Sequence, residues 1–535
     1  MSKKEIKRTL AYDAIVIGSG FAGIYMLYQL RKIGLSAIVL EKGFGIGGTW
    51  FWNKYPGARC DTESLQYSYQ FSEELQQEWE WTEKYATQPE ILKYINHVVD
   101  RFNLRKEIKL ITEVKEIIYN DEKKIWLVSS SDEQYKSKFC IMATGCLSTP
   151  NKPNIPGLNE FKGEVYQTSL WPNKKISFTN KNIAVIGTGS SAMQAIPIIS
   201  KKAKNLYVFQ RTSNYAVPAH NRELDPKEVM NFKKNYKENR EKAKTLVSGF
   251  LTDYNHKSAL QVSQDELKKE YDKRWKKGGL AFLAAFTDIA NNKKANKTTS
   301  DYIEKKIQEI VYDKKIAKLL TPNSIVGCKR LVIDTDYYKT FNNKNVYLFN
   351  AKKYPISKVD ETQIYTEEAI KNIDMIILAT GFDAMTGAMK QINIVGKNGI
   401  KLETKWKNGP KLYLGLATNG FPNFFIITGP GSPSVLTNMI PTIEQHVDWI
   451  AECLTYMKKK SVSTIEAKVD AENDWVDYNE KIARNTLRYN CKSWYLGSNI
   501  KGKKRIFMPF VGGLPVYIKK CEEIVANNYA GFEIN

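Results

Sequence analysis

The chain has 535 residues, 42% of them hydrophobic, and its 80 lysines and arginines against 57 acids give a net charge of +23. This length exceeds a single hydrophobic core and predicts two or three domains. The longest apolar run, residues 280–286, is too short to span a bilayer, and the charged residues 1–8 leave no room for a secretory signal, so we expect a cytoplasmic protein and no membrane partner.

The first apolar run of the chain ends in a glycine-rich turn. It leads into Gly18-Ser-Gly20-Phe-Ala22-Gly23, and Glu41 closes the next apolar stretch. This spacing predicts a strand, a helix and a second strand, in which the glycines let the backbone approach a pyrophosphate and the helix N-terminus supplies amides. An acid about 20 residues further on binds ribose hydroxyls, so Glu41 indicates a dinucleotide without a ribose phosphate, such as FAD or NAD.

A second glycine-rich turn follows another apolar run, and it is Gly187-Thr188-Gly189-Ser190-Ser191-Ala192. The next expected strand ends in Gln210-Arg211, where an acid would otherwise stand. A cation there suits a 2′-phosphate, so this unit predicts NADPH. One such turn alone can be an ordinary tight turn. Two of them in strand–turn–helix context, with opposite charge signatures, indicate a chain that passes electrons between two dinucleotides.

The layout of the chain follows from an Ala-Thr-Gly sequence that occurs twice, at 143–145 and 379–381, each time after an apolar run. The first copy precedes a proline-rich stretch that indicates a domain exit. We therefore expect an α/β fold of two Rossmann-like domains. A flavin domain comprises residues 1–150 and 389–535, and a nicotinamide domain, residues 151–388, interrupts it.

Residues from about 223 to about 320 are rich in Lys, Glu and aromatics at helical spacing and contain few Gly or Pro. They predict a helical insertion in the nicotinamide domain. The insertion either covers the active site or packs on a sheet edge, and the spacing does not decide between these positions.

The basic residues and the cysteines are both dispersed. Acids interrupt the lysines, as in residues 268–277, so we interpret the charge as a solvated surface and expect no nucleic-acid partner. The seven cysteines include no C-x-x-C pair and no metal-like spacing, which predicts free thiols and no metal site. The missing redox pair also counts against the disulfide-reductase relatives of two-dinucleotide flavoproteins.

Several motifs carry a resemblance to one family. Residues 47–61 match the pattern G-G-x-W-x-x-x-x-Y-P-G-x-x-x-D, and this stretch resembles the signature of flavin-dependent (type I) Baeyer–Villiger monooxygenases. Residues 161–172 resemble that family's fingerprint F-x-G-x-x-x-H-x-x-x-W-P, whose closing Trp-Pro separates it from heteroatom-oxidising flavin monooxygenases. Further matches at 328–330, 428–434 and 493–502 follow the family's order, so the resemblance covers nearly the whole chain.

The resemblance implies an activity and its cofactors. NADPH reduces FAD, O2 adds at flavin C4a, and the resulting C4a-peroxyflavin attacks a ketone carbonyl, after which carbon migration gives an ester or a lactone. The implied partners are a small ketone and O2, and we expect a monomer. Sulfoxidation by the same enzyme is also expected.

Arg330 and Asp61 are the catalytic residues that the resemblance implies. An anionic oxygen species beside a flavin needs a fixed positive charge, and a guanidinium stays protonated and presents several directed donors. Asp61 is expected to orient Arg330. The alternatives are a structural salt bridge for Arg330 and an N-cap of a following helix for Asp61.

The resemblance also implies the cofactor-binding residues. Those on the flavin side are Gly18, Gly20, Ala22, Gly23, Glu41, Thr49, Trp50, Arg59, Cys60, Asp61, Tyr67 and the backbones of Val114 and Met439. Those on the NADPH side are Thr188, Gly189, Ser190, Ser191, Ala192, Arg211, Thr212, Lys329, Arg330 and Trp494. Trp494 resembles a residue of a mobile loop, at about 488–505, that folds over the nicotinamide, although a single tryptophan is often a core residue.

One position departs from the family pattern, because Gln167 stands where the fingerprint has His. An amide keeps a donor and an acceptor but cannot become a protonated switch. Loss of that switch leaves open an uncoupled NADPH oxidase that releases peroxide. Two further alternatives to ketone oxidation also stay open, a heteroatom (N or S) monooxygenase and a non-catalytic basic flavoprotein that binds nucleic acid or acidic partners.

Overall fold

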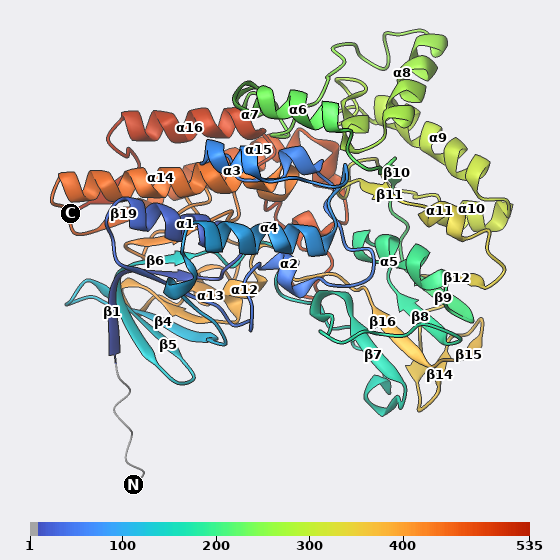
Figure 1. Cartoon of the computed structure of the whole chain (residues 1–535), viewed down its shortest axis with the longest axis horizontal. Helices are drawn as coiled ribbons and strands as arrows, with labels where there is room; N and C mark the ends of the chain where they lie inside the picture. The colour runs from blue at the N-terminus through green and yellow to red at the C-terminus, as the bar shows by residue number, and fades with distance from the viewer. Residues whose placement is uncertain (1–8) are drawn as a thin grey trace.

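The computed structural model describes residues 9–535, so the charged start of the chain, residues 1–8, lies outside the described residues. Two separate β-sheets, each flanked by helices, form the two halves of the molecule (Figure 1). This arrangement confirms the expected α/β fold with two Rossmann-like cores. Between residues 9 and 535, no helix combines the length and the apolar character that a membrane crossing needs.

The first sheet is built from both ends of the chain. Its strands follow the order β17-β4-β5-β6-β1-β2-β3, and β18 pairs with the second half of β6. Their bounds are β1 Thr9–Ile17, β2 Ala37–Leu40, β3 Ile108–Lys109, β4 Val114–Asn120, β5 Ile125–Ser130, β6 Gln134–Met142, β17 Asn393–Val395 and β18 Phe424–Ile426. Strands β6, β1, β2 and β3 run parallel, whereas β5 pairs antiparallel with β4 and with β6. The second half of β1 and all of β2 are buried on both faces, which explains why they are continuously apolar.

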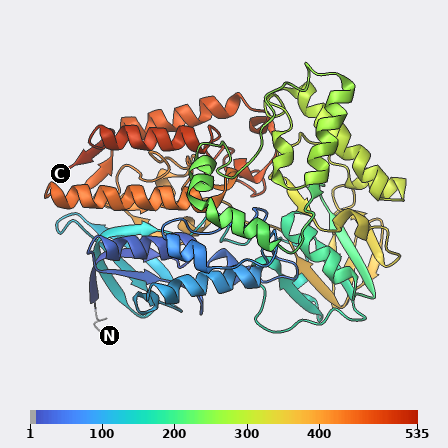
Figure 2. The same cartoon turned by 45° about the horizontal axis from the view of Figure 1, so that its top comes forward.

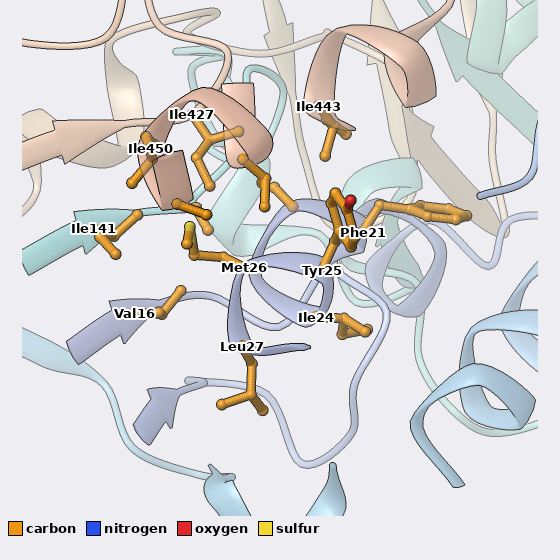
Figure 3. Packing of buried hydrophobic residues seen from close by; sticks show 14 of the residues in the cluster. Val16, Phe21, Ile24, Tyr25, Met26, Leu27, Ile141, Ile427, Ile443 and Ile450 are labelled. Carbon is orange, nitrogen blue, oxygen red and sulfur yellow. The ribbon is translucent and has the colours of Figure 1, made fainter. Parts of the chain in front are cut away.

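Helix α1 (Phe21–Lys32) connects β1 to β2 and lies in the core of the first half. It packs beside α14 (Met439–Lys459), so residues more than 400 positions apart in the chain share one core. Figure 3 shows Met26 of α1 between Val16 and Ile141 of the sheet and Ile450 of α14, all fully buried. The position of α1 follows from its burial on nearly every face, because only its last turn carries charge.

The first half of the molecule contains further helices. They are α2 Thr49–Trp52, α3 Glu73–Glu78, α4 Gln88–Arg101, α12 Gly387–Lys390, α13 Leu402–Lys405, α15 Val469–Arg484 and α16 Leu514–Ala526. Two short strands, β19 (Ile465–Ala467) and β20 (Phe532–Ile534), pair antiparallel near the C-terminus.

The second sheet is entirely parallel, with strand order β12-β9-β8-β16-β7. Its strands are β7 Glu164–Gln167, β8 Asn182–Ile186, β9 Asn205–Gln210, β12 Val346–Asn350 and β16 Met375–Leu378. Helix α5 (Ser190–Ser200) connects β8 to β9. Smaller elements of this half are β10 Ala216–Pro218, β11 Val332–Asp334, α11 Tyr337–Thr340, β13 Lys358–Val359, β14 Gln363–Tyr365 and β15 Ile370–Asn372.

Two chain segments connect the halves, and they run side by side. The amide of Asn151 donates to the carbonyl of Gly381 at 2.8 Å, and the amide of Asp383 donates to the carbonyl of Thr149 at 2.9 Å. These are the segments that follow the two Ala-Thr-Gly sequences. The domain limits at 150 and 388 stay predictions.

The expected helical insertion contains α6 (Pro226–Lys234), α7 (Tyr236–Lys244), α8 (Gln264–Lys277), α9 (Lys293–Ile310) and α10 (Lys314–Leu320). The insertion divides into two parts (Figure 2). Helices α6 and α7 contact the first half, where the guanidinium of Arg240 donates to the Gln66 carbonyl at 2.9 Å. Helices α8 to α10 join the core of the second half. The insertion therefore contacts both halves of the molecule. The helical periodicity of the sequence does not predict this division.

Candidate active site

The first dinucleotide turn brings three backbone segments together. Gly18 has φ +103°, and a Cβ there would lie 2.7 Å from the carbonyl oxygen of Ala143. A Cβ on Gly23 would lie 1.8 Å from the carbonyl of Gly18, and one on Gly48, at φ +53°, would lie 2.9 Å from the Cα of Gly20. Only glycine permits these approaches. The N-terminus of α1 begins at Gly20, which has no side chain to cap it, so its amides fit a pyrophosphate.

Glu41 lies at the end of β2, buried against the same turn. Its carboxylate accepts hydrogen bonds from the amide and the hydroxyl of Ser19, both at 2.9 Å, and from the amide of Gly43 at 2.8 Å. These donors fix the carboxylate beside the turn. Its position agrees with the predicted role toward a ribose, which stays a prediction.

Trp50 and Tyr67 form an aromatic pair next to this turn. Thr49 and Trp50 begin α2 directly after Gly48, and the Trp50 indole donates to the Tyr67 hydroxyl at 3.1 Å. Burial raises the pKa of Tyr67 well above its ordinary value, so its phenol stays neutral. The pair gives the turn a rigid apolar wall with satisfied polar ends, which suits a planar aromatic ligand.

Arg330 and Asp61 form the charged centre of the site. Nε of Arg330 donates to Oδ2 of Asp61 at 2.5 Å and Nη2 donates to Oδ1 at 2.9 Å, a bidentate pair between residues 269 positions apart. Nη1 donates to the Val435 carbonyl at 2.9 Å. The bidentate hydrogen bonds hold the pair firmly. The side chains of Arg330 and Asp61 are 23% and 28% exposed, so the pair remains partly accessible.

The charge on Arg330 is permanent. Burial opposes it, but the carboxylate of Asp61 outweighs burial and raises the pKa of Arg330 above its ordinary value. Burial also raises the pKa of the Cys60 thiol beside Asp61, and for a thiol this favours the neutral form. Arg330 is therefore a fixed cation oriented by one carboxylate. The alternative role of Asp61 as a helix N-cap is wrong, because the short 3-10 helix Ser64–Gln66 begins after Glu63.

The flavin-side motif also contacts the second half of the molecule. The Tyr55 hydroxyl donates to Oε1 of Gln194 on α5 at 2.8 Å, and Nε2 of Gln194 donates to the Arg59 carbonyl at 3.1 Å. A Cβ on Gly57 would lie 2.4 Å from the Gln194 carbonyl. Sequence reasoning missed Gln194. The sequence signal for it is its place two residues after the second glycine-rich turn.

The second dinucleotide turn repeats the geometry of the first. Gly187 has φ +114°, and a Cβ there would lie 2.4 Å from the Ala379 carbonyl, whereas a Cβ on Gly189 would meet nothing within 4 Å. Helix α5 begins after Gly189 with Ser190 and Ser191, and Ala192 is fully buried. The Thr188 hydroxyl donates to the Thr212 carbonyl at 2.9 Å, which ties the turn to the end of β9. The open space at Gly189 fits a pyrophosphate on the α5 amides.

Arg211 and Lys329 lie close enough to repel each other. Burial lowers the pKa of Lys329 below its ordinary value, and the nearby Arg211 lowers it further. Among residues 9–535, neither cation forms an ion pair with a carboxylate. Two neighbouring cations without an acid fit a doubly charged phosphate. Thr212 is exposed beside them.

Gln167 lies at the end of β7, next to the segments that connect the halves. Its Nε2 donates to the Asn151 carbonyl at 3.3 Å, and the Thr380 hydroxyl donates to the same carbonyl at 2.6 Å. The amide thus makes a structural hydrogen bond at the connection. Trp171, which closes the fingerprint, is buried against Tyr166 with ring centroids 5.4 Å apart.

The segment at 488–505 contacts the connection between the halves. The Asn499 side chain donates to the Phe382 carbonyl at 2.7 Å, and the Lys503 ammonium donates to the Ala384 carbonyl at 2.9 Å. Trp494 is half-buried, with its ring centroid 4.3 Å from that of Tyr495, at the edge of an apolar cluster that includes Val435. The mobility of this segment stays a prediction.

The remaining predicted flavin contacts lie on the first half. Val114 begins β4 and Met439 begins α14, whose first turn is capped by the Asn438 side chain. The Arg59 guanidinium is already paired with Glu83 at 3.0 Å, and it donates to the Tyr85 carbonyl at 3.3 Å. Arg59 thus forms a structural ion pair through Nη1, and its contact with a cofactor stays a prediction.

Comparisons with known proteins agree with this geometry. A family model described as "Pyridine nucleotide-disulphide oxidoreductase" matches residues 15–274. A phenazine N-monooxygenase of Lysobacter antibioticus is 39% identical, covering 97% of this chain and 96% of its own. Cyclohexanone 1,2-monooxygenase of an Acinetobacter species is 38% identical, covering 99% and 98%. A solved structure of an oxidized steroid monooxygenase bound to NADP is 45% identical, with a TM-score of 0.94 and coverage of 98% and 99%.

Proposed function

Because the chain belongs to the flavin-dependent Baeyer–Villiger monooxygenase family, with FAD and NADP as its cofactors, we propose that it inserts one oxygen atom of O2 into ketones to give esters or lactones. The observation that carries the proposal is the bidentate pair of Arg330 and Asp61 beside the first dinucleotide turn. When bound, the reduced flavin supplies the electrons and the site of oxygen activation.

Arg330 has one task in this chemistry. Negative charge develops on oxygen during the transfer to a carbonyl, and a preorganised guanidinium stabilises that charge without reorganising at the moment of reaction. Asp61 holds two of the guanidinium nitrogens, and the Val435 carbonyl accepts from the third. The guanidinium is therefore fixed in orientation before a substrate arrives.

The chain's other residues select and hold the two dinucleotides. Gly18, Gly20 and Gly23 bring the backbone close to the first pyrophosphate, and Glu41 binds the ribose of FAD. Arg211 and Lys329 bind the 2′-phosphate of NADPH, which explains two cations at this place and no acid. The apolar cluster around Val435 and Trp494 excludes water from the reacting atoms.

The activity is tested with purified protein, FAD, NADPH, O2 and a panel of cyclic, linear and aryl ketones, with product identity read by mass and by retention against authentic esters. We expect an ester or lactone one oxygen heavier than the ketone, with NADPH consumed in proportion. Absence of any ester from the panel, while amines are oxidised, contradicts the proposal.

Oxidation of a heteroatom is the second candidate, and the similarity to a phenazine N-monooxygenase favours it. An aromatic ring nitrogen attacks oxygen as a nucleophile, whereas a ketone is attacked as an electrophile. A competition between a ketone and phenazine separates the two activities by product. Sulfides do not discriminate, because both activities oxidise them.

We also propose a cytoplasmic monomer without nucleic-acid or membrane partners. All seven cysteines carry free thiols, which suits a reducing compartment. Cell fractionation tests the location, and size-exclusion chromatography with light scattering tests the monomer. A dimer mass or steep salt-dependent DNA binding contradicts these proposals.

A further inference from the structure

A line of contacting aromatic rings runs from the first dinucleotide turn into the core of the first half. Trp50 and Tyr67 lie beside the turn, with ring centroids 5.9 Å apart. The Tyr67 ring contacts Phe21 at 5.5 Å, and Phe21 contacts Tyr69 at 5.1 Å. Tyr69 contacts Tyr25 at 5.8 Å, and Tyr25 lies one turn after Phe21 on α1 (Figure 3). These rings form a continuous chain, and each residue is at most 9% exposed.

The last ring of this chain has a proton acceptor. The Tyr25 hydroxyl donates to Oδ1 of Asp448 on α14 at 2.6 Å, the length of a charge-assisted bond to a carboxylate. Nε2 of Gln29 donates to both of these oxygens, each at 2.7 Å, and fixes their geometry. Burial raises the pKa of Tyr25, and the charge of Asp448 raises it further, so the phenol keeps its proton in the resting protein. Asp448 is exposed and therefore meets solvent.

The other two tyrosines of the chain lack such an acceptor. The Tyr69 hydroxyl donates to the Phe21 carbonyl at 2.6 Å, and an amide oxygen is too weak a base to take the proton. The Tyr67 hydroxyl accepts from the Trp50 indole, and within residues 9–535 no carboxylate accepts from it. A phenol that loses an electron becomes a strong acid, so a tyrosine bonded to a carboxylate is oxidised most easily. Tyr25 is therefore the ring of the chain on which an oxidising equivalent is most stable.

We propose that Tyr25 is a redox-active tyrosine that receives an oxidising equivalent from the flavin site through Tyr67, Phe21 and Tyr69. A one-electron oxidant at the flavin site starts the step, and the light-excited oxidised flavin is the oxidant that tests it. One electron moves from Tyr25 to the flavin, the phenolic O–H bond breaks, and the proton passes to Asp448. Tyr25 becomes a neutral radical, and the flavin is reduced by one electron. The chain thus draws a reactive oxidising equivalent away from the cofactor toward the surface.

The proposal rests on the position of FAD at the first dinucleotide turn, which the proposed function also uses, but it does not rest on oxygen transfer. Light replaces NADPH and O2, so neither a ketone nor turnover is needed. The radical can form in a protein that makes no ester, and esters can form in a protein without the radical. The two experiments therefore distinguish failure of this proposal from failure of the proposed function.

Electron paramagnetic resonance of the FAD-loaded, full-length protein tests the proposal. The protein is kept free of O2, NADPH and substrate, illuminated with blue light and frozen. We expect a tyrosyl radical, identified by the narrowing of its signal when the protein carries ring-deuterated tyrosine. In transient absorption the radical should form more slowly in D2O, because proton transfer to Asp448 accompanies loss of the electron. A wild-type protein without a tyrosyl signal overturns the proposal.

Variants make the test specific. Tyr25→Phe keeps the ring and removes the phenol, so the tyrosyl signal should be lost. Asp448→Asn keeps a hydrogen-bond acceptor that cannot take the proton, so the signal should fall and its solvent isotope effect should disappear. Tyr302→Phe is the control and should keep the wild-type signal, because Tyr302 also donates to a carboxylate, that of Asp272 at 2.7 Å, but belongs to α9 of the insertion.

The two variants of the pair back each other. If Tyr25→Phe fails to fold, Asp448→Asn and the wild-type isotope effect decide. A tyrosyl signal of wild-type size in Tyr25→Phe, or a wild-type isotope effect in Asp448→Asn, overturns the proposal.

Discussion

The Tyr55 hydroxyl donates a 2.8 Å hydrogen bond to Oε1 of Gln194, and this contact joins the flavin-side motif to α5, the helix that follows the second dinucleotide turn. Burial raises the pKa of Tyr55 to about 12, so the phenol remains a donor across the physiological range. The two proposed cofactor sites therefore share one rigid contact, and Gly57 lies within it, close to the Gln194 carbonyl.

Gly57→Ala is expected to destabilise the protein and to loosen the contact between the halves. Gly57 has φ +82°, and its Cβ would lie 2.4 Å from a carbonyl, whereas Gly34 has φ +75° with nothing within 4 Å of its Cβ. Gly34→Ala is the matched control, because it shares the backbone strain and lacks the clash. In urea unfolding, Gly57→Ala should lose about 1–3 kcal/mol more than Gly34→Ala. Equal losses of unfolding free energy in the two variants would show that the close approach of Gly57 to the Gln194 carbonyl does not affect stability.

Asp61→Asn is expected to lower the rate of oxygen transfer by about 10- to 100-fold, as loss of an orienting partner does elsewhere. The amide keeps the size of the side chain but accepts only one hydrogen bond from Arg330 and leaves its charge unpaired. The readout is the share of NADPH that ends as peroxide, which a purely structural role would not change. Asp100→Asn, at an exposed pair with Arg105, is the control. An unchanged peroxide share in the Asp61 variant contradicts the positioning role.

Arg211→Ala and Lys329→Ala are each expected to weaken NADPH selectively. Loss of one charge-assisted hydrogen bond to a phosphate costs about 1.5–3 kcal/mol, which is about 10- to 100-fold in the apparent NADPH affinity, with little change for NADH. Stopped-flow flavin reduction against each nucleotide measures the preference. Lys162→Ala, at an exposed ion pair with Glu361, is the control. A retained preference in both variants would place the phosphate site elsewhere.

Glu444 on α14 predicts a pH dependence of stability. The side chain is buried, its carboxyl accepts from the Gln70 amide at 2.6 Å, and burial raises its pKa to about 8. The unfolded state releases this proton near pH 4.3, so stability from this group is fully present below that pH and falls by up to about 1.4 kcal/mol per pH unit until pH 8. Glu444→Gln should flatten the loss between pH 5 and 8, measured by urea unfolding. An identical slope in both proteins contradicts this assignment.

The fold and the cofactor turns could be predicted from sequence because their signals are local. Each of these signals lies within a stretch of about 30 residues. They are the two glycine-rich turns, the missing acid at Arg211 and the lysine-rich helices. The structure confirms the two parallel-sheet cores and the insertion. The comparisons confirm the family.

Contacts between distant segments could not be predicted in the same way. The bond from Tyr55 to Gln194 and the division of the insertion between the two halves depend on how the two halves pack, which no local sequence pattern encodes. Asp61 illustrates the limit. Its residue type favours a helix cap as much as an ion pair, and the structure decides between them because the nearby helix begins after Glu63 and the guanidinium of Arg330 lies against the carboxylate.

Ester formed per NADPH oxidised in Arg330→Ala, with peroxide measured in parallel, tests the central claim most directly. Arg330→Lys serves as the comparison, because it keeps the charge without the bidentate geometry. The fixed-cation account predicts that flavin reduction persists in Arg330→Ala while ester formation falls by about 10²–10³ and peroxide accounts for the NADPH, with Arg330→Lys in between. Wild-type ester yield from Arg330→Ala would contradict it.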